Sequence, residues 1–111
     1  MSFINLSEIG EREVVPGFRG KFIHSDNVTV AHWSIAAGSE LTEHNHPHEQ
    51  ITNVIDGELE LSIEGKTKRL KTGELAIVPS NTKHHGRAIT DCYVIDVFYP
   101  VREDYRIESE K

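Results

Sequence analysis

The stretch GSELTEHNHPHEQITNVIDG, residues 38–57, sets the fold, because it holds closely spaced metal-ligand side chains between two glycines. His44 and His46 lie one residue apart, and Gln50 follows after a proline-containing turn. Side chains two residues apart on a β-strand point to the same side, so we expect both imidazoles to face one way. A distant histidine, His84, completes a four-ligand set. Imidazole commonly binds Zn, Cu, Fe and Ni, so this pattern predicts a metal site.

Length and composition predict one globular domain, residues 1–111, with an ordinary apolar fraction. The net charge of −6 argues against nucleic acid or an anionic membrane as a partner, since both require a basic surface. Cys92 is the only cysteine and lies in an apolar stretch, so we expect a buried residue in a reducing compartment. Residues 1–12 have no basic segment followed by an apolar one, and we therefore expect a cytoplasmic protein.

Short β-like runs alternate with turn signals along the chain, and no long run has helical periodicity. Asp56-Gly57 and Glu64-Gly65 are typical of hairpin turns. The charge-rich end, residues 102–111, is expected to be a solvated tail. Together these features predict an all-β sandwich or barrel. The expected strands are residues 18–23, 28–35, 51–55, 59–63, 75–78 and 93–98.

Two spaced motifs resemble those of the cupin superfamily. The first begins at Gly38, passes through the histidine pair and Gln50, and ends at Gly57. The second begins at Gly73, continues through Pro79-Ser80-Asn81, and reaches His84 two residues later. The resemblance implies a double-stranded β-helix (jelly-roll) barrel with one divalent transition metal, Ni, Zn, Mn or Fe, inside its mouth.

Three positions depart from the cupin pattern: Gln50 replaces the usual Glu, Asn81 replaces a Gly, and Ala88 stands where an Asn often ends the motif. Asn tolerates the left-handed turn conformation better than most residues, so the turn can survive. Three histidines and a neutral amide leave the metal with its full charge, which favours anion binding. The alternative is a barrel that has lost its metal and in which the histidines only fill space.

The apolar run from Tyr93 to Tyr99 contains one carboxylate, Asp96. Burying an unpaired carboxylate is costly, so Asp96 must face solvent, find a partner or serve chemistry. Phe98 shares its strand face, and Arg102 follows close to the same barrel mouth. An acid, an aromatic ring and a cation beside a metal suit a small anionic sugar. The alternative is a structural Asp96–Arg102 ion pair with Phe98 in the core.

The tract from Asp96 to Tyr105, together with the three-His-one-Gln set, resembles the KdgF family of single-domain cupins from pectin and alginate breakdown. The resemblance implies metal binding by His44, His46, Gln50 and His84, and catalysis by Asp96, Phe98 and Arg102. It also implies the conversion of cyclic 4,5-unsaturated uronates to linear 4-deoxy-5-keto uronates without net redox.

Other polar residues near the motifs are expected to be ordinary. His48 lies in a turn and His85 alternates away from the site, although either can support the ligands. His24 and His32 are expected on the surface or outer face, and Trp33 in the core. Two other functions stay open, a cupin dioxygenase and a non-catalytic sugar-binding cupin. Family analogy also predicts a homodimer.

Overall fold

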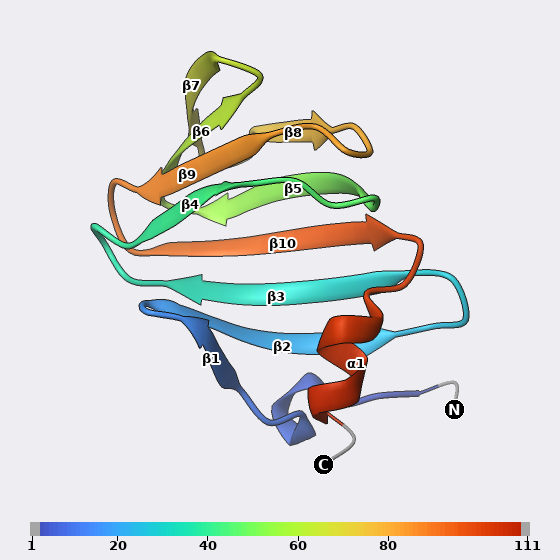
Figure 1. Ribbon diagram of the computed structural model, residues 1–111. Helices are drawn as coiled ribbons and strands as arrows, with labels where there is room; N and C mark the ends of the chain where they lie inside the picture. The colour runs from blue at the N-terminus through green and yellow to red at the C-terminus, as the bar shows by residue number, and fades with distance from the viewer. Residues whose placement is uncertain (1–2, 110–111) are drawn as a thin grey trace.

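The computed structural model describes residues 3–109, which form two antiparallel sheets, a 3₁₀ turn and one short helix (Figure 1). The strands are β1 (Arg12–Val15), β2 (Phe18–His24), β3 (Thr29–Ile35), β4 (Glu40–His44), β5 (Glu49–Asp56), β6 (Glu58–Ile63), β7 (Lys66–Lys71), β8 (Leu75–Val78), β9 (His84–Ala88) and β10 (Cys92–Tyr99). The 3₁₀ turn is Leu6–Glu8, and α1 is Glu103–Ser109. The predicted all-β fold is confirmed.

One sheet has the strand order β1-β2-β3-β10-β5-β8, and the other has the order β4-β9-β6-β7. Consecutive strands such as β4 and β5 therefore lie in different sheets, so their connections pass from one sheet to the other. Within residues 3–109 no helix has the length and apolar character needed to cross a membrane.

All six predicted strands exist, as β2, β3, β5, β6, β8 and β10. Strands β1, β4, β7 and β9 were not predicted from the sequence, because they bury few apolar side chains and so show no clear apolar alternation. In β7 only Leu70 is buried, and in β9 the buried positions are His84 and Ala88. Backbone pairing with neighbouring strands, rather than an apolar alternation, makes these segments extended.

Every second side chain of β10 points into the barrel interior. Cys92, Val94, Asp96 and Phe98 are buried, while the residues between them are more exposed. Trp33 on β3 is also buried, so the predictions that Trp33 and Cys92 belong to the core are confirmed. A single polar residue thus occupies an inward position of an otherwise apolar strand face.

The two predicted hairpin turns have different outcomes. Glu64 and Gly65 both have positive φ, 49° and 81°, and join the paired strands β6 and β7 as expected. Asp56-Gly57 does not form a hairpin turn, because β5 and β6 belong to different sheets. Gly57 has φ 100°, and a Cβ there would lie 2.3 Å from the Asp91 carbonyl oxygen, so the crossing requires glycine.

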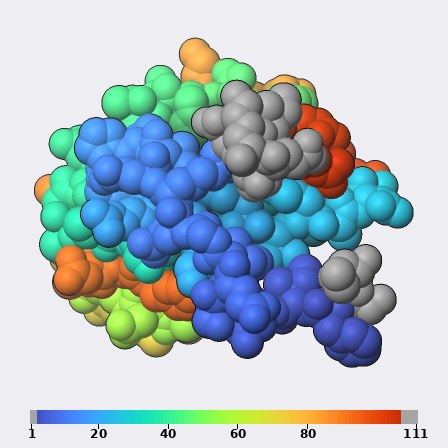
Figure 2. All heavy atoms as spheres, turned by 90° about the horizontal axis from the view of Figure 1, so that it is seen from below, coloured from blue at the N-terminus to red at the C-terminus, as the bar shows by residue number. Residues whose placement is uncertain are grey.

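The expectation of a solvated C-terminal tail is wrong for the described part, which forms α1. The Tyr105 ring packs 4.5 Å from the Phe22 ring, centroid to centroid, and Arg12 donates a 2.7 Å hydrogen bond to the Tyr105 carbonyl. Figure 2 shows the blue N-terminal segment spread over this face, with red C-terminal residues at its margin. The rest of that prediction, Glu110 and Lys111, lies outside the described residues.

Replacing Tyr105 with alanine should lower the free energy of unfolding by about 2–4 kcal/mol, because the ring packs against Phe22, Trp33 and Phe98. Urea denaturation monitored by Trp33 fluorescence measures this change. Tyr105→Phe is the matched control and should retain most of the stability. An alanine variant as stable as the parent would show that α1 does not brace the barrel.

Candidate functional site

Strand register brings the predicted site residues together from both sheets. His44 on β4 pairs with His84 on β9 in the four-stranded sheet. Gln50 on β5 pairs with Phe98 on β10 in the six-stranded sheet, and Asp96 lies two residues earlier on β10. All of them line one cavity, together with apolar residues of the barrel interior.

His46 lies in the connection between β4 and β5, so the prediction that both histidines share one strand is wrong. The three rings still converge. The His44 and His84 centroids lie 4.2 Å apart, and His46 lies 5.0 Å from His84 and 5.5 Å from His44. One ligand atom from each residue lies within 4.8 Å of the others, so the cluster can hold a metal ion.

Each of the three imidazoles has its Nδ1 atom at hydrogen-bonding distance from a backbone carbonyl oxygen. The distances are 2.9 Å from His44 to Thr42, 3.0 Å from His46 to His48, and 2.8 Å from His84 to Thr82. A carbonyl can only accept, so each Nδ1 carries the proton and donates it. The Nε2 atoms then keep their lone pairs, which is the tautomer that a metal ligand requires.

Two further observations show that the residues fit a metal. Nε2 of His84 is buried and has no hydrogen-bond partner in the described part of the chain, which is costly unless a ligand occupies it. The amide of Gln50 is oriented by a 2.9 Å hydrogen bond from its Nε2 to Thr52 Oγ1. Its Oε1 therefore faces His46, 3.1 Å from Nε2, and can serve as a neutral oxygen donor.

The environment keeps two of these histidines neutral. Burial, followed by the nearby charge of Arg102, lowers the pKa of His46 from 6.5 to about 4. Burial also lowers the pKa of His84. Because a metal competes with protons for the imidazole, these shifts favour metal binding near neutral pH.

One oxygen of Asp96 is held by a hydrogen bond, and the other is buried near the polar groups of Thr52 and Gln50. The indole N–H of Trp33 donates a 3.0 Å hydrogen bond to Asp96 Oδ2. Oδ1 is buried and has no hydrogen-bond partner among the described residues. Burial raises the pKa of Asp96 to about 6, opposed by the polar groups of Thr52, Trp33 and Gln50. A carboxyl group with this pKa can take or give a proton near neutrality.

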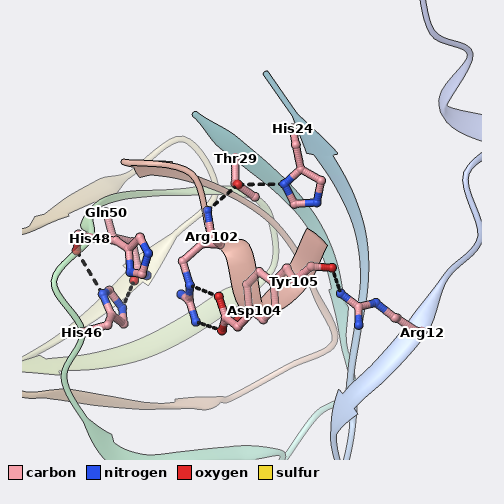
Figure 3. A network of polar contacts seen from close by, with 9 residues as sticks. All are labelled: Arg12, His24, Thr29, His46, His48, Gln50, Arg102, Asp104 and Tyr105. Carbon is pink, nitrogen blue, oxygen red and sulfur yellow. Dashed lines mark hydrogen bonds and ion pairs between the residues drawn. The ribbon is translucent and has the colours of Figure 1, made fainter. Parts of the chain in front are cut away.

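Arg102 lies at the same cavity, but the alternative of an Asp96–Arg102 ion pair is wrong. Nε and Nη2 of Arg102 donate to the two carboxylate oxygens of Asp104, at 3.0 and 2.8 Å. The guanidinium carbon lies 4.7 Å from the Phe98 ring centroid and 4.2 Å from the Tyr105 centroid. In Figure 3, Arg102 meets Asp104 on one side, and His46 and Gln50 lie on the other. Phe98 is buried, and it also lines the cavity.

The remaining histidines are mostly as expected. His85 is exposed and points away from His84, and His32 lies on the outer face, 2.6 Å from the Tyr93 hydroxyl. His24 is partly buried, with Nδ1 2.9 Å from Thr29 Oγ1. His48 supports the site through its backbone carbonyl, which accepts from His46.

Sequence reasoning missed the roles of several residues around the site, among them Trp33, Asp104 and Tyr105. The signal available in the sequence for Asp104 and Tyr105 was their position two and three residues after Arg102. No sequence signal pairs Trp33 with Asp96, because the two residues lie on different strands.

The family model for the cupin domain matches residues 31–98. The protein belongs to the cupin family. The chain is 34% identical over 96 residues to the pectin degradation protein KdgF of Dickeya dadantii (strain 3937), covering 84% of this chain and 87% of that protein. The structure of KdgF from Halomonas sp. is 32% identical and superposes with a TM-score of 0.88, over 95% of this chain and 98% of that one.

A third relative supports the fold alone. The RmlC-like cupin from Shewanella frigidimarina NCIMB 400 is 24% identical and has a TM-score of 0.89, covering 95% of this chain and 96% of that one. The predicted cupin barrel and the resemblance of this chain to KdgF are therefore confirmed.

His46→Ala should weaken metal binding by at least about tenfold, because it removes an inward Nε2 donor. Elemental analysis of protein purified without chelators measures the metal content, and the parent should be close to stoichiometric. His85→Ala is the matched control, since this histidine is exposed and points away from the cluster. If His46→Ala retains as much metal as His85→Ala, the assignment of the site is wrong.

Proposed function

We propose that this cupin converts 4,5-unsaturated uronate monosaccharides to linear 4-deoxy-5-keto uronates, in pectin or alginate breakdown. The supporting observation is the buried carboxyl group of Asp96, with its pKa raised to about 6, which lines the same cavity as the histidine cluster. The similarity to KdgF, one of whose members is named a pectin degradation protein, supports the substrate class.

His44, His46, Gln50 and His84 would hold the metal. When bound, it would supply positive charge and Lewis acidity for an anionic sugar, undiminished by a ligand carboxylate because Gln50 is neutral. Thr52 supports this role by keeping the Gln50 oxygen turned toward His46.

Asp96 is the group that moves a proton. Ring opening breaks the bond between C1 and the ring oxygen. The proton of the C1 hydroxyl is transferred to the ring oxygen, which leaves an aldehyde at C1 and an enol with its double bond between C4 and C5 and its hydroxyl on C5. Ketonisation then adds a proton at C4 and removes one from the enol hydroxyl, so the overall change is an isomerisation without net redox. The Trp33 hydrogen bond fixes one Asp96 oxygen, and the other is left to accept or donate a proton.

Phe98 and Arg102 bind and orient the substrate. The Phe98 ring offers an apolar face to the sugar, and the Arg102 guanidinium offers N–H donors to the uronate carboxylate. Both residues line the cavity that contains Asp96, so one bound sugar can reach all three.

The test mixes metal-loaded protein with unsaturated galacturonate produced by a polysaccharide lyase, and follows the loss of the ring double-bond absorbance. The parent should consume the substrate, with no oxygen uptake. Asp96→Asn should turn over at least about a hundredfold more slowly, because it loses the proton-transfer group. The variant should still fold, since the asparagine carbonyl can accept the Trp33 N–H bond.

Metal content and thermal melting are measured on the same samples. Near-parental turnover of Asp96→Asn would remove this residue from the mechanism. A collapsed melting temperature would return it to a structural role. A parent that leaves the double bond intact would refute the proposed reaction.

A cytoplasmic location and a homodimer stay predictions. The outer face of the six-stranded sheet is compatible with a second copy, because it exposes apolar side chains on neighbouring strands β5 and β8. They are Ile51, Ile55, Leu75 and Ile77.

A further inference from the structure

Arg102 is more tightly held than a surface arginine. Its side chain is only 11% exposed, and its backbone N–H donates a 2.8 Å hydrogen bond to Thr29 Oγ1. The guanidinium contacts the rings of Phe98 and Tyr105. Asp104 accepts two of its N–H groups (Figure 3). Asp104 itself is 56% exposed and does not line the cavity.

The charge of Arg102 has an attractive and a repulsive partner in the cavity. Asp96, which lines the same cavity, attracts it. His46 and His84 line that cavity as neutral rings, but they belong to a cluster suited to a divalent cation, which would repel the guanidinium when bound. Attraction to Asp104 opposes this repulsion from outside the cavity. The pair therefore differs from an exposed ion pair, which contributes little.

We propose that Asp104 is a positioning residue that holds the Arg102 guanidinium at the cavity for the carboxylate of the substrate. The inference rests on the proposed function. A guanidinium has five N–H donors, and Asp104 occupies Nε–H and one N–H of Nη2. Three donors stay available to a second carboxylate. Asp104 touches no substrate in this arrangement, so its effect passes entirely through Arg102.

Asp104 could also act by stabilising helix α1, and the experiment must distinguish this effect from the positioning of Arg102. Asp104 lies in the first turn of α1, where any carboxylate stabilises a helix. Glu103 lies in the same turn, is exposed, and pairs with Arg106 at 3.7 Å. Glu103→Gln therefore removes the same charge from the same turn without touching Arg102, and it is the matched control for Asp104→Asn.

The experiment measures KM and kcat of metal-loaded Asp104→Asn, Asp104→Glu and Glu103→Gln with unsaturated galacturonate. We expect Asp104→Asn to raise KM at least about fivefold with kcat within about twofold of the parent, because carboxylate binding is lost from ground and transition states alike. Asp104→Glu should recover most of the affinity, and Glu103→Gln should match the parent. Equal KM values for Asp104→Asn and Glu103→Gln would overturn the proposal.

A second readout does not depend on activity. In isotope-labelled protein, the Arg102 Nε–H signal should be distinct and protected in the parent and in Glu103→Gln, and it should move to the position of exposed arginines in Asp104→Asn. An unchanged signal in Asp104→Asn would overturn the positioning role even if KM rises, since the variant would then act by another route. A changed signal with an unchanged KM would overturn the link to the substrate carboxylate.

The outcome also separates this inference from the proposed reaction. If the parent does not consume unsaturated galacturonate, the reaction fails, and calorimetric affinity for galacturonate replaces KM in the same comparison. A fivefold loss of that affinity in Asp104→Asn alone would sustain the role of Asp104 in binding a uronate. A parent that binds no galacturonate would overturn both.

Discussion

The site depends on three hydrogen bonds between imidazole Nδ1 atoms and backbone carbonyl oxygens. Each carbonyl belongs to a residue two positions from its histidine: Thr42 for His44, His48 for His46, and Thr82 for His84. Local backbone thus fixes the tautomer of each ring and turns Nε2 toward the other two. Because these bonds are local, the three rings still converge even though His46 lies outside the strand that carries His44.

Charge is divided between the inside and the rim of the cavity. Asp96 sits inside, where burial raises its pKa to about 6, and an indole N–H holds one of its oxygens. Arg102 lies at the cavity, with its balancing carboxylate outside it on Asp104. With a divalent metal bound, this division would leave a positive site in which Asp96 can gain or lose a proton, and such a site suits a small anionic ligand.

Much of this arrangement could be predicted from the sequence, because ligand spacing and strand alternation are local patterns. The shared face of Asp96 and Phe98 follows from strand alternation. The ligand spacing indicated that His44, His46 and His84 converge, although His46 lies in a connection and not on the strand that carries His44. The partner of Asp96 could not be predicted, because Trp33 is on another strand and only the pairing of β3 with β10, which the sequence does not reveal, brings the two side chains together. Helix α1, whose Asp104 binds Arg102, was not predicted. Its sequence is mostly charged, and one aromatic ring, that of Tyr105, packs it against the barrel.

The most direct test of this account is a high-resolution crystal structure of the metal-loaded protein. The account predicts that the metal contacts Nε2 of His44, His46 and His84, with all three Nδ1–carbonyl hydrogen bonds retained, and that Oε1 of Gln50 faces the ion. Ligation through any Nδ1 atom, or a Gln50 amide turned away from the metal, would contradict it.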